Sequence, residues 1–219
     1  MTKLEYGKGY DLEMWRKRSK ERTDITGHLT HLTRIPRDNS EPLNVVIKRG
    51  VDILIKILKE RKIIGSNPSQ GFIVGNNPAV CFQEAPLYGV CQNIYHEQEN
   101  RQALGGKNRY DALGLSFAKR YVFEKGGRPV LYEDKDIAKK ILPMEEWWRI
   151  VSFNLADEGK IIDWTHEREW RVKEDFKFEL SETYVLLLNQ ATYRYFIEEI
   201  DKDTLKELKG IVVLQPILE

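Results

Sequence analysis

Apolar and polar positions follow two different periodicities along the chain, and together they predict short strands mixed with helices. Helical spacing is clearest over residues 43–62, where one face carries Ile47, Val51, Leu54 and Leu58. Short apolar runs bounded by turn residues predict strands at 27–33, 79–82, 112–117, 128–132, 166–172, 183–188 and 211–214. Further helices are expected at 9–22, 86–103, 118–125, 135–157 and 192–208, with Gly105-Gly106 ending the second of these.

The order of these elements favours an α+β fold. Strands and helices alternate irregularly, which does not match a regular βαβ array, so we expect a mixed, strongly bent sheet with flanking helices. The 219 residues contain no internal repeat and no linker. We therefore expect a single domain over residues 1–219, with residues 1–26 as an N-terminal helical extension.

Composition narrows the class of protein. Apolar residues make up 41% of the chain, which excludes a disordered protein, and the longest apolar run, Tyr184–Leu188, is far below the roughly 20 residues of a membrane helix. The charged N-terminus is not typical of a secretory signal. With only Cys81 and Cys91, no disulfide framework is expected. These features predict a cytoplasmic protein without membrane association.

The net charge excludes fewer classes of protein than the composition does. Thirty-five basic residues against 34 acidic ones give a net charge of +1, without the basic excess typical of a duplex-binding protein. The one dense basic cluster, at 16–22, contains its own acidic residue and predicts a solvated helix face, with nucleic-acid contact as the alternative. The cysteines and histidines lack zinc-ligand spacing, so no metal site is predicted.

Polar residues cluster on predicted strands that should otherwise be core. The clusters lie at 28–34, at 81–87 together with 114–119, and at 167–171. Period-two alternation in the last cluster would place Glu167, Glu169 and Arg171 on one face of a strand. Ionisable groups gathered in this way either are solvated or form a site.

The sequence motifs that include these clusters resemble a known group of bacterial proteins. HLTR, an amphipathic helix, VCFQEAPL, GLSFAKRYVFEKGGRPVLY and HEREWRV follow one another over about residues 27–175. This order is similar to AbiGi-type abortive-infection and phage-defence proteins and, more distantly, to the DarT-type DNA ADP-ribosyltransferases. The resemblance implies an ADP-ribosyltransferase-like fold, NAD⁺ as a consumed substrate, and a nucleic-acid or protein acceptor. It also implies a toxin or effector role in phage defence, with a cognate antitoxin or defence-system partner.

The resemblance also implies roles for individual residues. Glu169 corresponds to the catalytic carboxylate that stabilises an oxocarbenium-like transition state at the ribose. Glu167 would serve the acceptor, and His31 would bind the other ribose with Thr33 and Arg34 beside it. His31 and Glu169 should then line one cleft.

Other positions are implied at the cofactor. Phe82, Phe117 and Tyr132 are unranked candidates for stacking on nicotinamide, and Ser116 belongs to the same predicted surface. Arg34 and Arg128 suit bidentate binding of the pyrophosphate. His28 lies three positions before the motif match and is the less favoured histidine.

Structural roles are the alternatives for these residues. His31 could be a structural histidine, Phe82 and Phe117 could be core residues, and Glu169 and Arg171 could form an exposed ion pair worth about 0–1 kcal/mol. Two other functions stay open. One is a non-catalytic module that binds a nucleotide or phage product; the other is a metal-dependent nuclease that uses the scattered carboxylates of GRPVLYEDKD and HEREW.

Overall fold

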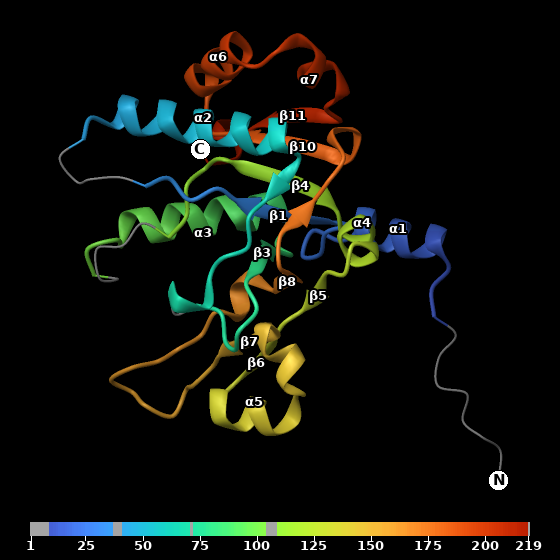
Figure 1. Cartoon of the computed structure of the whole chain (residues 1–219), viewed down its shortest axis with the longest axis vertical. Coiled ribbons are helices and arrows are strands. Elements are labelled where there is room, and N and C mark those ends of the chain that lie inside the picture. The colour runs from blue at the N-terminus through green and yellow to red at the C-terminus, as the bar shows by residue number, and fades with distance from the viewer. Residues whose placement is uncertain (1–8, 37–40, 71, 104–108, 219) are drawn as a thin grey trace.

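The computed structural model describes residues 9–36, 41–70, 72–103 and 109–218, and a seven-stranded mixed sheet organises them (Figure 1). The strand order is β11-β10-β4-β1-β3-β8-β5. β10 and β11 pair in parallel, whereas the other registered neighbours pair antiparallel. The predicted α+β class with a mixed sheet is confirmed. The strands are β1 (His28–Leu32), β3 (Ala79–Gln83), β4 (Gly114–Ala118), β5 (Arg128–Pro129), β8 (Glu169–Lys173), β10 (Thr183–Leu187) and β11 (Gly210–Val213).

Two small sheets and several helices complete the fold. β2 (Lys62–Ile63) pairs with β9 (Phe176–Lys177), and β6 (Leu131–Glu133) pairs with β7 (Ile150–Ser152). The α-helices are α1 (Leu12–Glu21), α2 (Leu43–Glu60), α3 (Leu87–Glu99), α4 (Lys119–Glu124), α5 (Lys135–Ile141), α6 (Gln190–Glu199), α7 (Lys202–Glu207) and α8 (Gln215–Leu218). Short 3₁₀ turns are η1 (Pro68–Gln70), η2 (Met144–Arg149), η3 (Thr165–Glu167) and η4 (Leu180–Glu182).

The helices form two layers around the main sheet. α2, α6 and α7 lie on one side, and α3 lies on the other, while β6, α5 and β7 form a projection away from both layers (Figure 1). The largest core cluster is on the α2 side, and a smaller one lies between α3, α8 and the sheet. We call the two sides of the sheet the α2 face and the α3 face.

Helix α2 shows how the apolar pattern determines this packing. Val51, Leu54 and Leu58 are fully buried, as their spacing predicts. Gly50 is buried with them, and a Cβ there would lie 2.4 Å from Cδ1 of Ile35 and 2.8 Å from Cδ1 of Leu113. This close packing explains why position 50 is a glycine, although glycine inside a helix costs about 1 kcal/mol relative to alanine.

Two of the predicted helices are interrupted in the structure. The helix expected over 135–157 is wrong beyond Ile141, because Pro143 forces the preceding Leu142 into an extended conformation. The chain continues as η2 and then as β7. The helix expected over 192–208 is split into α6 and α7, and the Asp201 side chain caps the second by accepting from the Thr204 amide at 2.8 Å.

Two predicted strands are interrupted. Residues 128–132 divide between β5 of the main sheet and β6 of the projection. In the segment 166–172, η3 comes first, Arg168 adopts a left-handed conformation with φ 47°, and β8 begins only at Glu169. The prediction that Glu167 and Glu169 share one strand face is therefore wrong.

Helix α3 ends at Glu99, earlier than expected, and the predicted stop at Gly105-Gly106 lies outside the described residues. Among the residues that the structure describes, no helix has both the length and the apolar character needed to span a bilayer.

Candidate functional site

A row of polar side chains crosses the α3 face of the main sheet. Tyr184 pairs with Ser116, Ser116 with Thr30, Thr30 with Gln83, and Gln83 with Glu169. Directly opposed residues of antiparallel strands project to the same face. The row therefore runs over five strands and spans about 19 Å at four strand spacings.

The inner part of this polar row is buried. Ser116, Thr30, Gln83 and Glu169 are each between 2% and 6% exposed, and the Asn93 amide of α3 donates to Gln83 Oε1 at 3.4 Å. Burying polar groups costs free energy unless they are hydrogen-bonded. A continuous buried row of hydroxyl, amide and carboxylate groups thus differs from the apolar packing of the α2 face.

The polar row crosses the sheet where two central strands separate. β1 and β4 share five registered pairs, whereas β1 and β3 share the single pair Thr30–Gln83. Beyond that pair the His31 imidazole bridges the strands, because its Nδ1 donates to the Cys81 carbonyl at 2.9 Å. The seam between β1 and β3 is therefore held by a side chain.

Glu169 is held by a buried arginine. Arg171 Nε donates to Glu169 Oε1 at 2.7 Å, and the two side chains are only 4% and 7% exposed. Although burial alone would lower it, the charge of Glu169 raises the pKa of Arg171. The alternative of an exposed ion pair is wrong, because the pair is enclosed by the projection and by β3.

The Cys81 thiol lies beside this ion pair, since Cys81 is opposite Arg171 in the register of β3 and β8. Burial, and then the negative charge of Glu169, raises the pKa of this thiol well above its ordinary value. Cys81 is therefore a neutral neighbour of the carboxylate rather than a nucleophile.

The backbone around Glu169 is also fixed. The Tyr132 hydroxyl accepts from the Glu169 amide at 2.6 Å, and burial raises the pKa of Tyr132 to about 12. The Glu84 amide donates to the Glu167 carbonyl at 3.0 Å, which joins the end of β3 to the turn before β8. Tyr132, a candidate for stacking on nicotinamide, therefore lies near Glu169 but supports its backbone.

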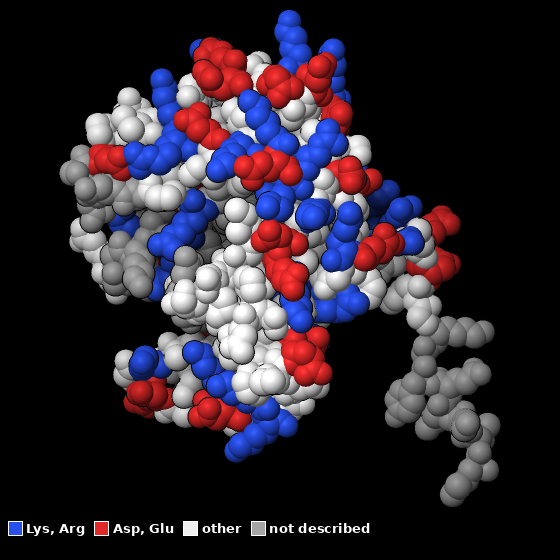
Figure 2. All heavy atoms as spheres, in the orientation of Figure 1, with Lys and Arg blue, Asp and Glu red and all other residues white. Residues whose placement is uncertain are grey.

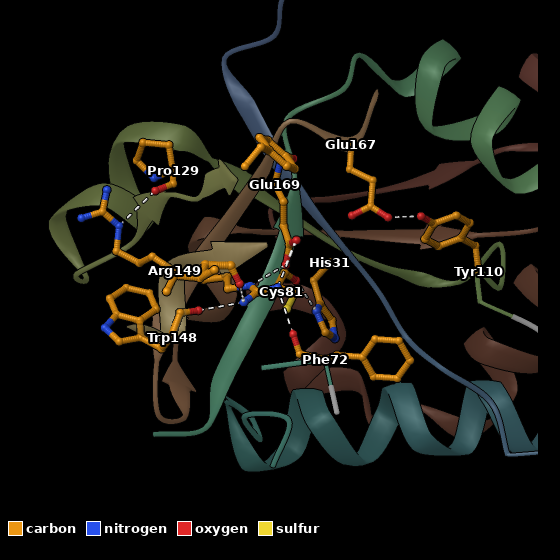
Figure 3. A network of polar contacts seen from close by, with 12 residues as sticks. His31, Phe72, Cys81, Tyr110, Pro129, Trp148, Arg149, Glu167 and Glu169 are labelled. Atoms are coloured by element: carbon orange, nitrogen blue, oxygen red, sulfur yellow. Dashed lines mark hydrogen bonds and ion pairs between the residues drawn. The ribbon is translucent and has the colours of Figure 1, made fainter. Parts of the chain in front are cut away.

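Glu167 points away from Glu169, toward the segment after α3 (Figure 3). One of its carboxylate oxygens accepts from the Tyr110 hydroxyl. Burial, and then the charge of Glu169, raises the pKa of Glu167 to about 8. The two glutamates thus differ in environment: an arginine neutralises Glu169, whereas Glu167 is mostly protonated at neutral pH.

The register places His31 and Glu169 on opposite faces of the sheet. His31 pairs with Leu115 and shares the α2 face with Phe82, whose ring centroid is 5.9 Å from its own. The expectation that His31 and Glu169 line one cleft is therefore wrong. Burial lowers the pKa of His31, although its hydrogen bond to Cys81 opposes the shift.

The other histidine of the repeated His-x-Thr pattern lies on the face of Glu169. His28 and Thr30 alternate with Leu29, so both project to the α3 face. The His28 side chain is exposed at the end of β1, and its ring lies 5.8 Å from that of Tyr184. His28-x-Thr30, rather than His31-x-Thr33, belongs with the polar row.

The remaining predicted cofactor residues divide into core residues and residues with local partners. Phe82 and Phe117 are at most 1% exposed and pack edge-to-face with Phe176, so neither offers a free ring face. The structure thus contradicts their proposed stacking role, because both complete the α2-face core.

Thr33, Arg34 and Arg128 lie apart from the polar row. Thr33 is buried, and within the described residues its hydroxyl has no hydrogen-bond partner, while Arg34 is exposed. The Arg128 guanidinium donates to the Phe123 and Gly127 carbonyls at 3.0 and 2.7 Å. Of the predicted cofactor residues, only Ser116 is part of the polar row.

Arg171, Gln83 and Thr30 were not predicted from the sequence as members of this site. The Glu169-x-Arg171 spacing did signal a shared face, but nothing in the sequence showed that the pair is buried. Gln83 follows the four apolar residues 79–82 of β3. A polar residue at the end of a core strand was the signal that the sequence offered.

Basic and acidic side chains are mixed on the face of the molecule that Figure 2 shows. Figure 2 shows lysine and arginine side chains interspersed with aspartate and glutamate over the face in view, in line with the net charge of +1. Across the described part of the chain, no group of three or more histidine, cysteine, aspartate or glutamate side chains is arranged to hold a metal ion.

Comparison with known proteins adds no relative: no family model, no curated protein and no solved structure matches the chain.

Proposed function

We propose that the protein is an ADP-ribosyltransferase-like enzyme that cleaves NAD⁺ and transfers ADP-ribose to a macromolecule, nucleic acid or protein. The observation that carries the proposal is the Glu169 carboxylate, which is charge-paired, buried and placed at the end of the polar row. In line with the motif resemblance, Glu169 is the first residue of β8, a strand late in the chain. In the sheet, β3 alone lies between β8 and β1. The proposal includes the ADP-ribosyltransferase-like fold and a cytoplasmic toxin or effector role in phage defence, with a cognate partner.

The chemistry fits a preorganised carboxylate. Loss of nicotinamide builds positive charge on the ribose, and a carboxylate held in a site of low dielectric constant stabilises that charge without reorganising. Thr30, Gln83 and Ser116 are hydrogen-bonding groups of the kind that bind ribose hydroxyls. His28 takes the ribose-binding role that the motif comparison had given to His31.

The test is nicotinamide release from NAD⁺, followed by mass spectrometry of added nucleic acid and protein. Glu169→Gln keeps the size of the side chain and removes its charge, so release should fall about 10²–10³-fold. Glu179→Gln is the matched control, because that side chain is 60% exposed. Equal rates for Glu169→Gln and the parent would contradict the assignment of Glu169.

A non-catalytic binding module is the second candidate, and the burial of Glu169 favours it. If the carboxylate only completes a structural ion pair, the parent protein will release no nicotinamide. Adding NAD⁺ or ADP-ribose will still raise its thermal unfolding midpoint by mass action. Cleavage of nucleic acid that EDTA abolishes and Mg²⁺ restores would instead support the nuclease alternative.

A further inference from the structure

We propose that Arg171 is the positioning residue for Glu169: it holds the carboxylate in one orientation and in its charged form. The inference rests on the proposed function for the role of Glu169, but its structural part can be tested without any enzymatic activity.

The Arg171 guanidinium divides its donors between the carboxylate and the backbone. Nε and Nη2 reach the two Glu169 oxygens at 2.7 and 3.3 Å, which is a bidentate arrangement. Nη1 donates to the Trp148 and Ile150 carbonyls at 2.8 and 3.0 Å, and Nη2 also reaches the Phe72 carbonyl at 3.4 Å. A lysine could supply the charge but not this planar set of donors.

The three carbonyl contacts fix the guanidinium from outside. They come from the loop before β3 and from η2 and β7 in the projection, so the position of Arg171 does not depend on Glu169 (Figure 3). The reverse does not hold, because a carboxylate this buried becomes protonated when no cation is beside it. Arg171 therefore sets both the direction and the charge of Glu169.

The arrangement leaves Glu169 able to act. A carboxylate offers about four lone-pair positions; the guanidinium occupies two of them, and the Cys81 thiol also interacts with the carboxylate. A remaining position would face the developing cation of the proposed reaction, with the compensating arginine behind the carboxylate.

The first arm of the test measures nicotinamide release. Arg171→Met should lower kcat about 10²-fold with little change in KM, which is the size of effect expected when a reacting group is misplaced. The pH at which its kcat reaches half of its maximum should also lie above that of the parent, because the unpaired buried carboxyl must first lose its proton. The kcat of Arg171→Lys should lie between those of the parent and of Arg171→Met. The lysine variant provides the test if the methionine variant does not fold.

Arg149 provides a matched control in the same projection. Its Nε donates to the Pro129 carbonyl at 3.1 Å and its Nη1 pairs with Glu146 at 3.2 Å, without contact to Glu169. Arg149→Met should therefore keep kcat and the pH profile of the parent. An equal loss of kcat in Arg149→Met and Arg171→Met would overturn the proposal, since the projection alone would then be responsible.

The second arm compares denaturant unfolding for Arg171→Met, for Glu169→Gln and for the double variant. If Arg171 positions the carboxylate, the double variant should lose less stability than the two single losses combined. Additive losses would mean that Arg171 serves only the backbone carbonyls, which overturns the proposal. If the parent releases no nicotinamide but the losses are non-additive, the proposed function fails while the positioning of Glu169 by Arg171 stands.

Discussion

The two faces of the seven-stranded sheet are built from different side chains. On the α2 face, Phe82, Phe117 and Phe176 form an edge-to-face cluster with centroids 5.1–6.2 Å apart, enclosed by aliphatic residues of α2. The middle of the α3 face carries the polar row instead. Apolar burial stabilises a domain without specifying a task, whereas a buried polar row lowers stability relative to an apolar one and indicates a function. The α2 face therefore supplies most of the stability, and the polar row of the α3 face is where the proposed chemistry would take place.

The largest expected effect on stability comes from a substitution on the α2 face. Phe117→Ala removes a fully buried ring that contacts three other phenylalanines, and it should lower the free energy of unfolding by about 3–5 kcal/mol. Urea denaturation followed by circular dichroism measures the loss. Tyr88→Ala is the control, because Tyr88 is 62% exposed and its removal should change stability by less than about 0.5 kcal/mol. Similar losses from the two substitutions would contradict the location of the core.

The second expected effect is on the α3 face and depends on pH. The pKa of Glu167 is about 8 in the folded protein against an ordinary value of 4.5, so folding retains a proton that the unfolded chain releases. The folded protein therefore loses stability as pH rises from about 4.5 to about 8. Glu167→Gln removes this dependence, so its stability relative to the parent should improve by on the order of 4 kcal/mol between pH 5 and pH 8.5.

Denaturant unfolding at several pH values checks this prediction, with Glu179→Gln as an exposed control. The glutamine can still accept from the Tyr110 hydroxyl, so the local hydrogen bond is kept. A difference between Glu167→Gln and the parent that stays constant with pH would show that Glu167 is ionised in the folded protein.

The same contrast explains how much the sequence could predict. Helix α2 was predictable because a face packed only with apolar side chains leaves its period in the sequence. The end of α5 could also have been predicted, because Pro143 does not allow the helix to continue through the residue before it. The left-handed Arg168 was not, because a non-glycine residue with positive φ is imposed by its tertiary surroundings.

The polar row could not be predicted from the sequence, for a different reason. Its members come from five strands, and only the register between the strands makes them neighbours. Sequence analysis could name Glu169 and Ser116 separately, but it could not show that Thr30 and Gln83 connect them. For the same reason the choice between His28 and His31 needed the pairing of β1 with β4.

The smallest expected stability effects decide between these two histidines. His31→Leu removes the donor to the Cys81 carbonyl and should lower the free energy of unfolding by about 1 kcal/mol, with little change in nicotinamide release. His28→Gln alters an exposed side chain, so its stability should stay within about 0.5 kcal/mol of the parent. If His28 binds ribose on the face of Glu169, the same substitution should raise the KM for NAD⁺. Both variants would be compared by denaturant unfolding and by initial rates over a range of NAD⁺ concentrations. The opposite result, a raised KM for His31→Leu and none for His28→Gln, would show that the ligand enters through the β1–β3 seam from the α2 face.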